Sequence, residues 1–187
     1  MKRLFLTLPL LFSGSLLAAD WEVDGAASSL SFVSTKNVDV AESHQFTRVS
    51  GSLQGDGSFV LEIDLKSLDT KIPIRNDRIH ENLLDDAAAA SVTGKVDPVL
   101  LGDIGVGESQ QLDLAAELNL LGTSTPLAAK VSVTAAEGSL QVVSVEPVLL
   151  NMRVLGLGNG IEKLREIAGL TSISVAVPVS FNVLLRR

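Results

Sequence analysis

The chain has two histidines, and neither stands at a spacing that binds a metal ion. His44 lies in a polar segment with Glu42 and Ser43, which we predict to be a loop, and His80 lies on a predicted helix beside Glu81. Metal sites built on one element place a second ligand three or four residues away on the same face. The sequence contains no His-x-x-x-His or Glu-x-x-His and no cysteine. We therefore expect no metal centre and no thiol chemistry.

Serine and glycine residues are also arranged without a catalytic pattern. A Gly-x-Ser-x-Gly turn, which exposes a nucleophilic serine between a strand and a helix, does not occur. Gly156 to Gly160 precedes a predicted helix, but it lacks the lysine of a phosphate-binding loop. We predict that the protein is not an enzyme. An esterase-like hydrolase stays open as a third hypothesis, because composition alone does not exclude a Ser-His-Asp arrangement.

Three arginines stand where they could contact the polar part of a ligand. Arg75 and Arg78 open a predicted helix, and we expect them at the mouth of a barrel. The alternative is a solvated pair that Asp77 or Glu81 neutralises within the same helix. Arg153 interrupts an apolar segment, so it either lies partly buried beside a carboxylate or lines the same mouth. We predict all three as headgroup contacts.

Long stretches of alternating apolar and polar residues must position these side chains. Apolar residues recur at every second position from Leu112 to Leu120, from Leu127 to Val133 and from Ile173 to Phe181. A period of two places one set on each face of a β-strand. Such strands hide their common apolar face by closing into a barrel or by stacking as two sheets. We predict a mainly β protein, an eight-stranded antiparallel barrel with two short helices, at residues 74–85 and 160–168.

The side chains that would face the interior of this barrel are large and apolar. A barrel of about eight strands has an interior that side chains can fill or that can hold one slim ligand. Ligand-binding positions in the interior are predicted at Phe32, Phe59, Leu61, Ile63, Leu114, Leu118, Val131, Val133 and Val177. A dry core shows the same alternation, so both interpretations stay open at these positions.

Residues 1–19 are typical of a secretory signal peptide. A basic start, Lys2 and Arg3, precedes an apolar run from Leu4 to Leu17, and small residues end it. The run is short for a bilayer span, and no second run of membrane length follows. We predict export to the periplasm or secretion, and one domain at residues 20–187 without an integral membrane span after cleavage. The alternative is an uncleaved N-terminal anchor.

The predicted mature chain is acidic. Of the 15 basic residues, 13 remain without Lys2 and Arg3, against 22 acidic residues, which gives a net charge of −9. Nucleic acids and anionic membrane surfaces both need positive charge on a protein partner. We therefore predict no nucleic-acid partner.

Three segments of the chain together carry a family resemblance. They are residues 21–24 followed by 29–32, residues 67–70 followed by 75–78 at a strand-to-helix junction, and residues 118–127, where a short apolar strand meets a Gly-Thr turn. In this order they resemble the start, the strand-to-helix junction and the hairpin of the YceI family of exported lipid-binding proteins. The resemblance implies a lipocalin-like barrel with a long apolar tunnel for an isoprenoid chain. The second predicted helix and the alanine run after the first helix depart from the common pattern of the family.

These observations predict a protein that carries or sequesters an isoprenoid or another long-chain lipid. We expect no cofactor other than such a hydrophobic small molecule, for example an isoprenoid quinone or a fatty acyl ligand. The alternative is an interaction module of the cell envelope with a filled barrel core and no small ligand. A homodimer also stays open.

Overall fold

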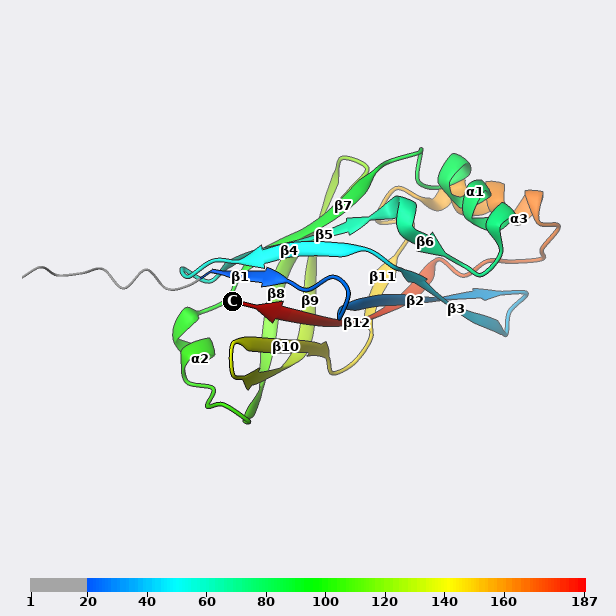
Figure 1. Cartoon of the computed structure of the whole chain (residues 1–187). Coiled ribbons are helices and arrows are strands. Elements are labelled where there is room, and N and C mark those ends of the chain that lie inside the picture. Colours follow the sequence, from blue (N-terminus) through cyan, green and yellow to red (C-terminus); the bar gives the residue numbers. More distant parts are fainter. Residues whose placement is uncertain (1–19) are drawn as a thin grey trace, which may run out of the picture.

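The computed structural model describes residues 20–187, and the signal-peptide prediction for residues 1–19 lies outside them. Eight antiparallel strands close into a ring, as predicted (Figure 1). Pairing of Glu22 with Arg186 joins the first strand to the last and closes the ring. In ring order the strands are β1 (Trp21–Val23), β4 (Val49–Leu53), β5 (Ser58–Asp64), β7 (Ala89–Lys95), β8 (Ser109–Leu120), β9 (Thr123–Ala136), β10 (Ser139–Ser144) and β12 (Ala176–Arg186).

Four further strands lengthen the barrel at one end. They are β2 (Ser29–Lys36), β3 (Val40–Phe46), β6 (Leu68–Asp69) and β11 (Val148–Asn151). β12 serves both parts, because its C-terminal half pairs with β10 and β1 while its N-terminal half pairs with β11 and β2. Pro178 of β12 has no backbone N–H to give to a ladder, and the pairing with β2 begins one residue beyond it, at Val179.

The alternating pattern of the sequence forms the longest hairpin of the barrel. β8 and β9 pair along their length, from Ser109 opposite Thr134 to Leu120 opposite Thr123. On β8, Leu112, Leu118 and Leu120 are buried and Leu114 and Ala116 are half-buried, whereas the residues that alternate with them are exposed on the outer face. The period of two therefore separates an apolar inside from a polar outside, as predicted.

In the described part of the chain, residues 20–187, three α-helices rather than the two predicted lie outside the sheet. α1 (Pro73–Asn82) and α3 (Gly158–Ile167) correspond to the predicted helices, and α2 (Pro98–Gly102) is additional; a 3-10 turn spans Leu65–Ser67. α2 was missed because five residues are too few to show a helical period of apolar side chains. Its start is nonetheless encoded locally, because the Asp97 side chain accepts a hydrogen bond from the backbone N–H of Val99.

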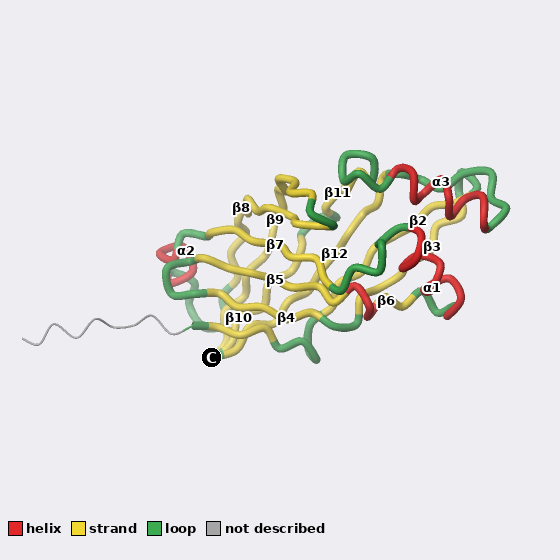
Figure 2. The backbone as a smooth tube through the Cα atoms, turned by 90° about the horizontal axis from the view of Figure 1, so that it is seen from above, coloured by secondary structure: helices red, strands yellow, loops and turns green. Residues whose placement is uncertain are grey.

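α1 and α3 cover the lengthened end of the barrel, and α2 lies at the opposite end (Figure 1, Figure 2). The two covering helices approach closely because Gly160 of α3 has no side chain. A Cβ atom at this position would lie 2.7 Å from the carbonyl oxygen of Asn82, at the end of α1. A larger residue would therefore separate the helices that close this end.

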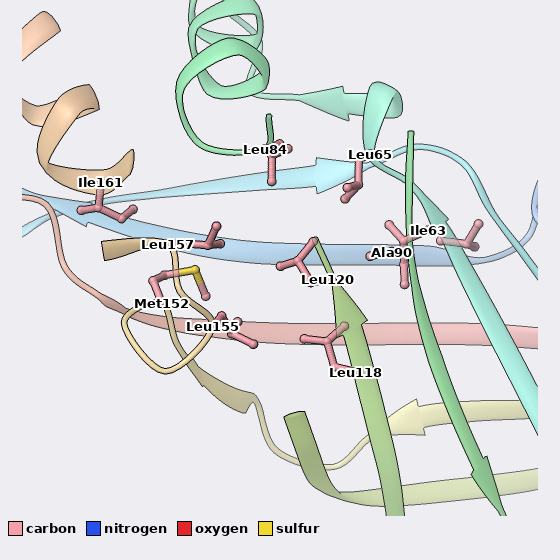
Figure 3. Packing of buried hydrophobic residues seen from close by; sticks show 11 residues of the cluster. Ile63, Leu65, Leu84, Ala90, Leu118, Leu120, Met152, Leu155, Leu157 and Ile161 are labelled. Carbon is pink, nitrogen blue, oxygen red and sulfur yellow. The ribbon is translucent and has the colours of Figure 1, made fainter. Parts of the chain in front are cut away.

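Two clusters of buried apolar side chains stabilise the two ends. The first cluster contains Leu84, which follows α1, Ile161 of α3 and Leu120 of β8 (Figure 3). In the second, Val131 and Val133 of β9 are only 1% and 2% exposed. Each fully buried side chain of this size contributes roughly 1.5–3 kcal/mol of transfer free energy.

Candidate ligand-binding cavity

A cavity of about 620 Å³ lies inside the barrel. Its wall includes Ile161 of the first buried cluster and Leu140 of the second, so it extends from the helical cover towards the opposite end. Small-molecule sites typically enclose about 300–1,000 Å³ and are mostly apolar with a few polar groups. The volume and the lining therefore suit a ligand that is largely hydrocarbon.

All nine interior residues predicted from the sequence stand on the wall of this cavity. They come from five strands, β2, β5, β8, β9 and β12, and each lies at an inward position of its strand. The nine are Phe32, Phe59, Leu61, Ile63, Leu114, Leu118, Val131, Val133 and Val177. Their contact with a ligand stays a prediction.

The accessibility of inward-facing side chains indicates a hollow middle. Phe59, Leu114 and Ala129 line the cavity, and each is only half-buried although its strand lies in the closed ring. In a filled barrel, inward side chains at such positions would pack at the density of a protein core. The space between the two buried clusters is thus not plugged by the protein's own residues, which favours the ligand-binding interpretation over a dry core.

The lining changes from apolar to polar along the β2–β3 hairpin. Inward residues of the two strands pair across the hairpin, first Leu30 with Phe46, then Phe32 with His44, then Ser34 with Glu42; Lys36 follows at the end of β2. These last residues were not among the predicted site residues, although the period of two continues unbroken through them. Polar side chains at inward positions are also typical of the end of a strand, so the sequence alone did not indicate that these residues line the interior.

His44 is a buried strand residue, and its predicted placement in a polar loop is wrong. It is 5% exposed, its Nε2 lies 2.9 Å from the hydroxyl oxygen of Ser34, and its ring meets the edge of Phe32 with centroids 5.3 Å apart. Burial first, and the Arg75 guanidinium second, lower the pKa of His44 below its ordinary value of 6.5. The imidazole is therefore neutral at pH 7.

Arg75 joins α1 to the hairpin rather than pairing within its own helix. Its guanidinium donates to Glu42 Oε2 at 2.8 Å and to the carbonyl oxygen of Thr70 at 2.6 Å. Lys36 contacts the same Glu42 oxygen at 2.8 Å. The hydrogen bond from Lys36, together with the charge of Arg75, lowers the pKa of Glu42. The prediction of a pair neutralised by Asp77 or Glu81 is thus wrong for Arg75.

The other two predicted arginines differ in position. Arg78 is exposed and contributes to the wall at the helical end of the cavity, where a mouth was predicted. Arg153 is exposed and does not line the cavity, so the prediction that places it at the mouth is wrong. β11 ends at Asn151, whose side-chain oxygen accepts from the backbone N–H groups of Arg153 and Val154 and turns the chain outward.

Comparisons with known proteins agree with this geometry. Residues 21–185 match the family model described as YceI-like domain. A solved polyisoprenoid-binding domain from Saccharophagus degradans, implicated in plant cell wall breakdown, is 35% identical with a TM-score of 0.86, over 91% of this chain and 98% of that one. Burkholderia cenocepacia BcnA is 19% identical with a TM-score of 0.67, over 87% and 98%, and shows a similar fold. No curated protein matches the chain. Among residues 20–187, no helix has the length and apolar character needed to cross a bilayer.

Proposed function

The chain belongs to the YceI-like domain family, and we propose on that premise that it is an exported carrier of a long-chain apolar ligand, an isoprenoid or another lipid. The observation that supports this proposal most is the cavity of about 620 Å³, lined by apolar side chains from both the ring and its extension. The protein acts by holding the hydrocarbon away from water, without a chemical step.

The energetics of such a ligand favour a site of this kind. Burial of a hydrocarbon chain contributes about 0.8 kcal/mol per CH₂ group. A chain of about ten buried CH₂ groups would thus gain about 8 kcal/mol before the entropic costs of association are subtracted. Few polar contacts are then needed for affinity, which is consistent with a wall made mainly of apolar side chains.

The solved domain from Saccharophagus degradans supports an isoprenoid as the ligand. That protein is described as polyisoprenoid-binding, and it shares 35% identity over 91% of this chain. A linear isoprenoid and a fatty acyl chain are both slim, so the width of a barrel of about eight strands admits either. Export is proposed from residues 1–19, whose composition is that of a signal peptide.

Extraction of the purified protein with organic solvent, followed by mass spectrometry, tests the carrier proposal. We expect a long-chain species in about stoichiometric amount, or uptake of an added polyprenyl quinone or fatty acid by ligand-free protein. An empty extract together with no uptake would instead favour the interaction module with no small ligand. A reference protein of similar size without a cavity, carried through the same extraction, controls for adventitious lipid.

A further inference from the structure

The cavity ends in a cluster of polar side chains that the carrier function alone does not require. Ser34, Lys36, Glu42 and His44 enter it from the β2–β3 hairpin, and Arg75 enters it from α1. The hairpin and α1 lie at the same end of the molecule (Figure 1). All five line the same cavity as the apolar residues. A tail lying along the barrel would place its headgroup among them.

Two buried nitrogen atoms of this cluster are left without a partner. Within residues 20–187, neither His44 Nδ1 nor Arg75 Nε has a hydrogen-bond partner, although the remaining polar atoms of both side chains are bonded. Leaving a buried polar group unpaired costs free energy that a suitably placed acceptor recovers. With the Ser34 hydroxyl donating to His44 Nε2, the Nδ1 atom carries the proton and is a donor. The cluster then has two N–H donors without an acceptor.

The charges of the cluster do not balance. Within the cluster, Glu42 is shared by Lys36 and Arg75, at 2.8 Å from each, so two cations face one carboxylate and one positive charge remains. Arg78 also lines this end of the cavity, but it is exposed, so water and salt screen its charge. His44 is buried and neutral and adds no charge. Outside the cavity, Asp69 and Lys71 lie two residues apart and carry opposite charges, so they change this balance little.

We propose, building on the carrier function, that this cluster binds the headgroup of a singly charged acidic amphiphile, a long-chain carboxylate. One carboxylate neutralises the remaining positive charge and accepts hydrogen bonds from His44 and Arg75. A phosphate monoester carries a charge between about −1.5 and −2 at pH 7, which would overcompensate the cluster. A neutral alcohol would leave the positive charge uncompensated in a largely apolar surrounding.

The test compares two ligands with the same hydrocarbon chain. Equilibrium dialysis of the purified protein against radiolabelled palmitate and radiolabelled hexadecanol gives a ratio of affinities in which the contribution of the tail cancels. We expect palmitate to bind roughly tenfold more tightly, because hydrogen bonds to charged groups are the stronger ones. Arg75→Met should bring the ratio close to one.

Arg48→Met is the matched control. Arg48 also pairs with a carboxylate, that of Asp64 at 2.7 Å, but it does not line the cavity. Its replacement changes the net charge of the protein equally and should leave the ratio unchanged. An equal effect of the two substitutions would show that only the overall charge matters and would overturn the proposal.

The wild-type ratio decides the question even if the Arg75 variant fails to fold. Equal binding of palmitate and hexadecanol would overturn the headgroup site and leave the carrier function standing. Absence of binding of both ligands, and of a polyprenyl quinone, would overturn the carrier function and the headgroup site with it. His44→Phe, which keeps the ring beside Phe32, should also lower the ratio.

Discussion

Replacing Ala129 with phenylalanine tests whether the interior of the barrel is a binding site. Ala129 lies on β9 opposite Leu114 of β8, and it lines the cavity with a half-buried side chain. A cavity of about 150 Å³ holds a benzene molecule, so the new ring would occupy about a quarter of the cavity of about 620 Å³.

The expected loss of affinity follows from the carbon atoms that the ring displaces. Its six carbons exclude at most about six CH₂ groups of a tail, which at about 0.8 kcal/mol each sets an upper limit of about 5 kcal/mol. A tail that bends around the ring loses about half of this, so binding should weaken by about 50-fold or more. Since the ring enters existing space, the free energy of unfolding of Ala129→Phe should stay within about 1 kcal/mol of the wild type.

Dialysis against radiolabelled palmitate and urea unfolding followed by circular dichroism measure both quantities. Ala128→Phe is the control, because Ala128 precedes Ala129 on the same strand and is exposed on the outer face. In a solid interior the same ring would overpack the core and destabilise it by about 1–3 kcal/mol. A folded Ala129→Phe variant that binds palmitate as tightly as Ala128→Phe does would refute the reasoning.

Three further predictions concern stability. Burial lowers the pKa of His44 below 6.5, so the free energy of unfolding should fall as the pH drops below about 6.5. The change in urea midpoint between about pH 7 and pH 5 should therefore be smaller for ligand-free His44→Phe than for the ligand-free wild type. The hydrogen bond from the backbone N–H of Ser58 contributes most to lowering the pKa of Asp56, to about 2. The free energy of unfolding that this carboxylate contributes is lost as the pH falls from about 3.8 towards about 2. In urea unfolding measured over this pH range, Asp56→Asn should therefore lose less stability than the wild type. A Cβ atom on Gly94 would lie 2.8 Å from the carbonyl oxygen of Ala115, which cannot move aside, and 2.5 Å from Cζ of Phe59. Gly94→Ala should therefore cost about 1–3 kcal/mol in urea unfolding, and an unchanged midpoint would contradict this packing.

The strands were predictable because a period of two is a property of neighbouring residues. Leu112, Leu118 and Leu120 alternate with exposed residues, and that alone assigns the inner face of β8. The closure of the ring was inferred from the need to hide this face. The particular pairing that closes it joins Glu22 to Arg186, and no local pattern connects residues so far apart in the chain.

The wall of the cavity was predictable, whereas its hollowness was not. Inward positions follow from alternation, so Phe59 and Leu114 could be assigned to the interior from the sequence. Whether such side chains meet across the barrel depends on strand number, tilt and side-chain volume together. The half-buried state of both residues is the structural observation that separates a cavity from a core.

The arginines show how far a local pattern can mislead. Arg75 sits among helical carboxylates in the sequence, yet its ion-pair partner is Glu42, which reaches it from β3 across the cavity end. Arg153 interrupts an apolar segment, but Asn151 turns the backbone outward just before it. In both cases the deciding contact is tertiary or depends on a turn, and neither leaves a periodic signal.

The depth of the cavity and its polar end are set by the same hairpin. If the β2–β3 hairpin stopped at the apolar pair Leu30 and Phe46, the wall would end there, whereas the continuation of both strands adds Phe32, Ser34 and His44. The segment that lengthens the space for a tail thus also supplies the hydrogen-bonding groups at the end of that space. From this coupling we infer that a change in the length of the β2–β3 hairpin would alter the preferred chain length and the preferred headgroup together, because the polar side chains move with the end of the barrel.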